Sequence, residues 1–180
     1  MKGLTDKKPA AALLVLMVAT GVIPNMAKAT VDAPTTTVGR GHHESIELDR
    51  ETRLEFTAPD GWQRVDRASK DDVAYLRDGG IVRVSATKSI DHLPTAITRK
   101  VQSAALDGEH LHLEEQTRTT AHGFTGKYGV TANRNNSRQG RCALVGQDQF
   151  MIVVTSTADH GTPAHDITPL VDSLTVKATK

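Results

Sequence analysis

Apolar and polar side chains alternate with a period of two through most of the chain after residue 44, and this limits the possible folds more than any other feature. The alternation is clear at Ile46–Leu48, at Leu54–Phe56 and over Ile81–Thr87. Successive side chains of an extended strand point to opposite faces, so this pattern predicts half-buried strands. The run Phe150–Val154 (FMIVV) is apolar throughout, which predicts a central strand covered on both faces.

One segment in the middle of the chain has helical spacing instead. Leu93, Ile97 and Val101 recur every four residues, Pro94 suits a first turn, and Gly108 suits the exit. This predicts a one-sided helix that lies across an apolar surface. A second stretch with helical spacing near the carboxyl end contains Ile167, Leu170, Val171 and Leu174. It fits either one kinked helix or a turn followed by a short helix.

Strands, a helix, more strands and a final helix predict the α+β class, an antiparallel β-sheet with helices packed on it. The predicted domain covers 44–178. Residues 30–43 are rich in Thr, Pro and Gly without apolar periodicity, which predicts a flexible linker before it.

Residues 1–29 have the pattern of a secretory signal peptide. A short basic start precedes an uncharged apolar run over 9–24, and Ala27-Lys28-Ala29 presents the small side chains that signal peptidase requires. The apolar run is shorter than the ~20 residues that span a bilayer comfortably, which favours cleavage over a retained anchor. We therefore expect a secreted or extracytoplasmic protein that contacts the membrane only transiently, through this segment.

Charge and composition narrow the classes of partner. Four of the 22 Lys and Arg and one of the 21 Asp and Glu lie in 1–29, so the remaining chain has a net charge of −2. Its charges are interspersed, whereas a nucleic-acid partner requires a concentrated basic face.

Cys142, the only cysteine, excludes an internal disulfide. It is interpreted either as a reactive thiol or as a small buried side chain on a strand, and its apolar neighbours favour burial.

The segment Phe56-Thr57-Ala58-Pro59-Asp60-Gly61-Trp62 resembles the F-x-x-P-x-G-W opening of PsbP/Mog1-like sandwich domains. Actinobacterial envelope proteins use this fold, including LpqN-type lipoproteins and type VII secretion-associated proteins. The resemblance extends in layout over roughly 44–177. It implies a non-enzymatic accessory domain, with no catalytic residues to carry over. The chain departs from the LpqN type because it has no cysteine after the signal for lipid attachment.

Three residues on one predicted strand form a candidate metal site. His110, His112 and Glu114 alternate with leucines and would stand in a row on one face, at a spacing that lets strand histidines share a zinc ion. A third or fourth ligand would have to come from elsewhere, with His122, His160 and His165 as candidates. The alternative interpretation is the solvent-facing side of a sheet strand, which we favour.

Trp62 is the remaining candidate. A tryptophan after Pro-x-Gly usually closes one end of a core, and lining a ligand cleft is the alternative. Catalytic motifs such as G-x-S-x-G or H-E-x-x-H do not occur in the sequence. Gly123–Lys127 lacks the spacing of a phosphate-binding loop.

We therefore expect a non-catalytic binding domain without a cofactor, whose partner is an envelope protein or a glycolipid, with a possible link to secretion. Two alternatives stay open. One is an exported metal-dependent hydrolase that uses the histidine row. The other is a carrier of small apolar ligands, with its cleft between the helix at 93–107 and the sheet.

Overall fold

The computed structural model of the chain describes residues 34–66, 71–134 and 137–179. The predicted signal peptide, residues 1–29, lies outside them. No helix among the described residues has the length and apolar character needed to cross a membrane. The described residues from Thr35 onward belong to one compact unit.

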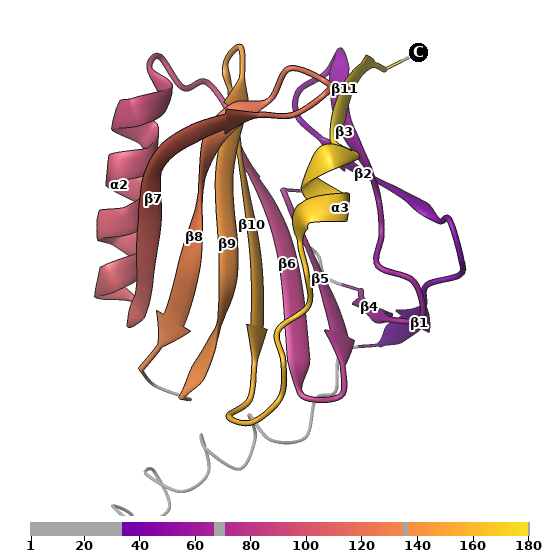
Figure 1. Ribbon diagram of the computed structural model, residues 1–180. Coiled ribbons are helices and arrows are strands. Elements are labelled where there is room, and N and C mark those ends of the chain that lie inside the picture. Colours follow the sequence, from indigo (N-terminus) through magenta and orange to yellow (C-terminus); the bar gives the residue numbers. More distant parts are fainter. Residues whose placement is uncertain (1–33, 67–70, 135–136, 180) are drawn as a thin grey trace, which may run out of the picture. The chain divides into compact units, whose positions relative to one another are not determined.

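Within the described ranges, eight strands form one antiparallel sheet (Figure 1). From edge to edge its strands are β1 (Thr35–Thr37), β4 (Gln63–Val65), β5 (Asp72–Arg77), β6 (Gly80–Thr87), β10 (Phe150–Ala158), β9 (Arg138–Gln147), β8 (Thr125–Asn133) and β7 (Glu109–Thr119). The predicted central strand is confirmed. It is β10, in which Met151 to Val154 are each at most 4% exposed.

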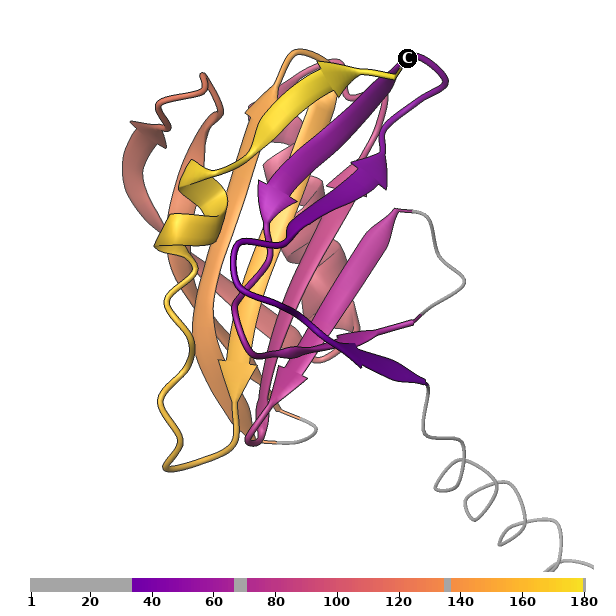
Figure 2. The same cartoon turned by 90° about the vertical axis from the view of Figure 1, so that its right-hand side faces the viewer.

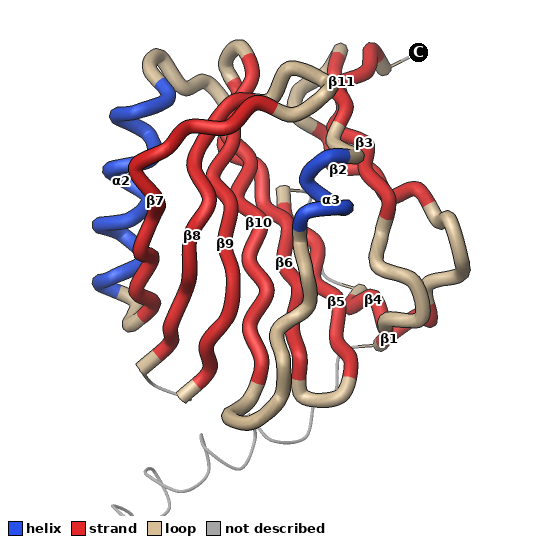
Figure 3. Tube along the Cα trace, in the orientation of Figure 1, coloured by secondary structure: helices blue, strands red, loops and turns tan. Residues whose placement is uncertain are grey.

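A second, smaller sheet packs against one face of the large sheet. Its strands are β11 (Thr175–Ala178), β3 (Thr52–Thr57) and β2 (His43–Glu47), in that order. The short helix α3 (Thr168–Asp172) lies on the same face, whereas the long helix α2 (Leu93–Leu106) lies on the opposite face (Figures 2 and 3). The predicted class, an antiparallel sheet with helices packed on it, is confirmed. The separate second sheet was not predicted.

The period of two explains why the large sheet has a core on each face. Ile152 and Val154 of β10 are fully buried with the three-stranded sheet and α3. Met151 and Val153, which alternate with them, pack instead with Ile97 of α2. The continuous apolar run at the start of β10, Phe150–Val154, therefore serves two separate cores.

Two turns of the structure contain an Asp-Gly pair. The β5–β6 hairpin closes through Asp78 (φ 45°) and Gly79 (φ 75°), the paired left-handed conformation that twists with the flanking strands. Gly61 has a φ of 73° in the turn before Trp62, a conformation that glycine adopts without steric cost.

The predicted linker over 30–43 is wrong for its second half. Thr35–Thr37 forms β1, which pairs with Gln63–Val65 of β4, and Val38 is only 5% exposed in the core. His43 already belongs to β2. The threonines of β1 show no alternation of apolar and polar side chains, so the strand was not predicted. A short edge strand is held by backbone hydrogen bonds and requires no buried face.

Both helices are close to their predicted positions. Pro94 lies in the first turn of α2, and the chain leaves it through Gly108, whose φ of 80° is typical of a helix exit. Near residue 167 the sequence allowed either one kinked helix or a turn followed by a short helix, and the structure has the turn followed by the short helix α3. The carboxylate of Asp166 accepts hydrogen bonds from the backbone N–H (3.1 Å) and hydroxyl (2.8 Å) of Thr168, and these lower the pKa of Asp166.

Candidate ligand-binding groove

A groove of about 700 Å³ lies between α2 and the outer strands of the large sheet. Its walls are mostly apolar. Leu93, Ile97 and Val101 line it from the helix, and Leu111 and Leu113 line it from β7. Ile97 and Leu111 are each 8% exposed, whereas the other three side chains are only half-buried. Apolar surface thus stays open to solvent along this flank of the helix.

A break in strand pairing accounts for the position of the groove. β7 pairs regularly with β8 up to Leu113 and again from Thr117, with a register shift between them. A bulge of this kind bends the strand that carries it. Figure 1 shows β7 running beside α2 and then curving over the end of the sheet. The helix is straight, so helix and strand separate at the bend, beside the first turns of α2.

Strand β8 supplies the base of the groove through Thr125, Gly126 and Lys127. Gly126 packs so closely on β9 that a Cβ atom there would stand 2.0 Å from the carbonyl oxygen of Leu144. Lys127 pairs across the sheet with Thr117 on one side and Leu144 on the other, and its side chain is half-buried. It is the one charged side chain among the residues that line this groove, all of which the structure describes.

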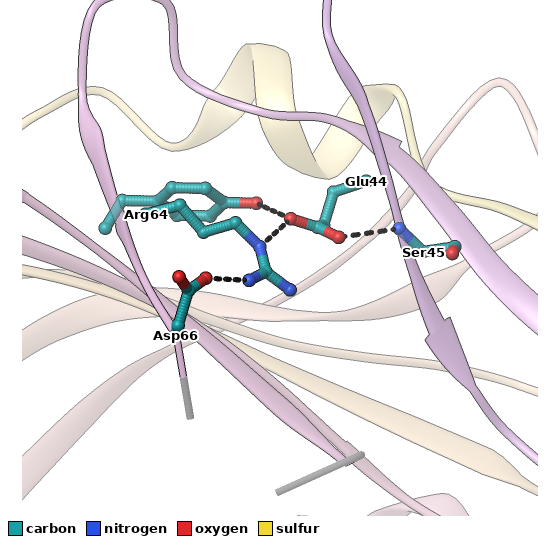
Figure 4. Close-up of polar contacts among 5 residues, drawn as sticks. Glu44, Ser45, Arg64 and Asp66 are labelled. Atoms are coloured by element: carbon teal, nitrogen blue, oxygen red, sulfur yellow. Dashed lines mark hydrogen bonds and ion pairs between the residues drawn. The ribbon is translucent and has the colours of Figure 1, made fainter. Parts of the chain in front are cut away.

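A second polar cluster lies where the two sheets meet (Figure 4). The Glu44 carboxylate of β2 accepts a hydrogen bond from Nε of Arg64 on β4 at 2.5 Å, and Arg64 also contacts Asp66 at 2.7 Å. The hydroxyl of Tyr75, which is fully buried, donates to Glu44 at 3.4 Å. The Glu44 carboxylate raises the pKa of Arg64, and burial raises the pKa of Tyr75.

This cluster is built to hold the sheets together. The carboxylate has a permanent cation beside it, and a phenol whose proton is held tightly cannot act as an acid near neutral pH. The Tyr75 phenol is therefore not a proton donor near neutral pH, and Glu44 is engaged by Arg64. We assign Glu44, Arg64 and Tyr75 a structural role at the inter-sheet boundary.

The predicted histidine row lies on β7 on the face away from α2. His110 and His112 are exposed and stand opposite Ala132 and Val130 of β8. Glu114 falls inside the register shift and forms an ion pair with Arg118 at 2.7 Å. Across the described ranges, the structure brings no three His, Cys, Asp or Glu side chains together in a metal-binding arrangement.

Trp62 lies at the end of the core and does not line the groove. It is 6% exposed, and its ring packs 5.0 Å from the ring of His165, counted between centroids. The ring also packs closely on Gly80, where a Cβ atom would be 3.1 Å from the indole. Burial lowers the pKa of His165, so the imidazole in this contact favours its neutral form.

Cys142 is buried on β9, as its apolar neighbours predicted, with 1% of its surface exposed. Burial raises the pKa of its thiol to about 12. The thiolate is the reactive species, so this cysteine is a packing residue near neutral pH.

Sequence reasoning anticipated a cleft beside the long helix but missed Lys127. The residue appeared only within Gly123–Lys127, a segment rejected as a phosphate loop. Lys127 lies on the face of the sheet that carries α2, because it pairs with Leu144 of β9. The sequence alone does not show this register. A lone lysine in a threonine- and glycine-rich strand carries no pattern that would reveal this.

No protein-family model matches the chain, and neither does any curated protein. Among solved structures, a protein of Bacteroides thetaiotaomicron VPI-5482 is similar at a TM-score of 0.42 and 13% identity over 71% of this chain. The chain spans 45% of that protein's length. The Ran-binding protein Mog1p of Saccharomyces cerevisiae is similar at a TM-score of 0.42 and 11% identity, over 71% of this chain and 78% of Mog1p.

Proposed function

We propose that the chain is an exported, non-catalytic binding domain of the cell envelope whose groove holds the apolar chain of a lipid or glycolipid. One observation carries this proposal, the groove between α2 and β7. Its volume of about 700 Å³ falls in the range of roughly 300–1,000 Å³ that is usual for small-ligand sites. Covering its half-exposed leucines and valine with an apolar chain is favourable by about 25 cal/mol per Å².

The chemistry of the groove favours binding over catalysis. Its lining combines aliphatic side chains with threonine hydroxyls, one amide and one lysine. Acid–base or nucleophilic catalysis requires a pair of groups within hydrogen-bond reach, such as a carboxylate beside a histidine. The lining supplies no such pair, and His110 and His112 lie on the other side of the sheet. The apolar-carrier alternative is therefore the form of binding function that this geometry supports best.

Export and an envelope role are supported by sequence alone. The support is the basic start, the apolar run and the Ala27–Ala29 site, together with the resemblance of Phe56–Trp62 to envelope domains of the LpqN type and of type VII secretion. A link to secretion, or an envelope protein as partner, belongs to the same proposal.

Expression of the full chain in the source cell tests export. We expect the protein in the envelope or culture-medium fraction, with an intact mass that corresponds to a chain beginning at Thr30. The matched control is Ala27→Gln with Ala29→Gln, which should block cleavage and leave the full mass. Recovery of uncleaved wild-type protein in the cytoplasmic fraction would contradict export.

Val101→Gln is expected to weaken binding of a neutral apolar probe by about tenfold. The substitution places an amide against the ligand chain, and an unpaired amide costs about 1–3 kcal/mol, while 1.4 kcal/mol is tenfold in affinity. The measurement is a fluorescence titration with N-phenyl-1-naphthylamine, which brightens when it enters an apolar site.

Leu106→Gln is the matched control for this titration. Leu106 belongs to the same helix but is 89% exposed and lies outside the groove, so its substitution should leave probe affinity unchanged. A wild-type protein that fails to bind the probe, or equal binding by the two variants, would contradict the proposal. Capture of a protein partner by a chain that binds no probe would favour the protein-binding alternative.

A further inference from the structure

Lys127 is an uncompensated cation in an apolar setting. Its side chain is half-buried on the α2 face of β8, and no described residue forms a hydrogen bond or an ion pair with it. A lysine can lay its aliphatic stem along apolar surface while its ammonium stays in contact with water. The ammonium of Lys127 is therefore available to an anionic group that enters the groove.

The half-buried arginines of the described residues have carboxylate partners. Arg64 faces Glu44 at 2.5 Å, and Arg138 faces Asp159 at 2.8 Å. Lys100, on the other flank of α2, borders a hollow that is also lined by acidic side chains. The groove beside Lys127 has no carboxylate in its lining, so an anionic group of a ligand would meet this ammonium without a competing protein carboxylate.

The register of the strands gives the groove a polar end and an apolar end. Lys127 pairs with Thr117 next to the bend of β7, while Leu111 and Leu113 lie on the other side of the register shift. Cross-strand partners stand about 4.5–5.5 Å apart, so the Thr117 hydroxyl and the Lys127 ammonium can reach the same small group. The Thr98 hydroxyl already donates to the carbonyl of Pro94 and contributes nothing further to this end.

We infer that the ligand of the groove is a single-chain amphiphile with an anionic head, a long-chain carboxylate or phosphate. The head binds the ammonium of Lys127 and accepts a hydrogen bond from Thr117. The alkyl chain runs between α2 and β7 toward Leu111. This inference rests on the proposed function, because it names the chemical class of ligand for the same groove.

Displacement of the neutral probe by three competitors at pH 8 tests the inference. Dodecanoate carries chain and charge, dodecan-1-ol carries the chain alone, and butanoate carries the charge with almost no chain. In the wild-type protein we expect dodecanoate to compete about tenfold more strongly than the alcohol, as one charge-assisted hydrogen bond would produce. Butanoate should not compete at comparable concentrations.

Lys127→Met should remove the preference for the acid and leave competition by the alcohol unchanged. Lys100→Met, the same substitution on the other flank of α2, is the matched control and should retain the preference. Thermal unfolding of both variants verifies that they fold. Dodecyl phosphate in place of dodecanoate identifies which anionic head is preferred.

The outcomes distinguish a failure of this inference from a failure of the proposed function. Equal competition by dodecanoate and dodecan-1-ol, or an acid preference that survives in Lys127→Met, would overturn the anionic-head assignment while the groove remains an apolar site. Competition by butanoate as strong as by dodecanoate would show a simple anion site and overturn the amphiphile. Failure of the probe itself to bind would overturn both.

Discussion

Gly140→Ala is expected to lower the free energy of unfolding by about 3 kcal/mol or more, at the upper end of the cost of overpacking. A Cβ atom at Gly140 would stand 1.7 Å from the carbonyl oxygen of Ser156 and 2.7 Å from its carbon. Both contacts are to the backbone of β10, the central strand, so no side chain can rotate away. Relief requires β9 and β10 to separate where Gly140 pairs with Thr157.

Urea unfolding followed by circular dichroism measures this effect. The loss corresponds to a fall in Tm of roughly 6–12 °C, since 1 kcal/mol is about 2–4 °C in a domain of this size. Gly39→Ala is the matched control, because a Cβ atom there meets nothing within 4 Å and should change stability by less than about 0.5 kcal/mol. Similar stabilities for the two variants would show that the strands accommodate a methyl group at Gly140.

Arg64→Met is expected to cost about 2–4 kcal/mol of folding free energy. It leaves the Glu44 carboxylate, whose side chain is 11% exposed, without its cation at the boundary between the sheets. Breaking a buried pair by removing one partner usually costs about 3–5 kcal/mol, and we place the value lower because the Arg64 side chain is itself 34% exposed.

A double-mutant cycle with Glu44→Gln isolates the pair. Arg64→Met should cost less in the Glu44→Gln background, because a neutral amide requires no cation. Lys88→Met removes a surface pair with Asp71, whose side chains are 36% and 56% exposed, and should cost less than about 1 kcal/mol. If the Arg64→Met protein is as stable as the Lys88→Met protein, the structural role assigned to the cluster between the sheets is wrong.

The sequence predicted most elements because their signals are local. Period-two alternation located most of the strands. The hairpin at Asp78-Gly79 is local in the same sense, because only a few residue types adopt its positive φ angles easily. Four-residue spacing located α2. In each case the physical cause lies within about ten residues of chain, where a pattern can report it.

The features that sequence reasoning missed depend on contacts between distant segments. β1 is a strand only because β4 offers it backbone hydrogen bonds. The second sheet forms because β2 and β3 present one apolar face to the large sheet, and alternation does not say which strands share a sheet. The same holds for the groove, which follows from a slip of register between β7 and β8.

The candidate residues also differ in whether local sequence or distant contacts determine their surroundings. Cys142 was correctly expected to be buried, because its apolar neighbours on one strand report its surroundings. Trp62 likewise closes the core, as the turn before it suggested. The importance of Lys127 comes from what stands across from it on β7 and on α2, and that information is absent from its own neighbourhood in the chain.

The pairing of β11 with β3 has a consequence for the order in which the molecule can be made. Thr175 lies opposite Glu55, 120 residues earlier. Strand β3 therefore cannot complete its pairing until β11 has been synthesised. Contacts of such long separation form late and slowly. A polypeptide that leaves the ribosome, or threads through a translocation channel, amino end first keeps one edge of β3 unpaired until residues 175–178 emerge.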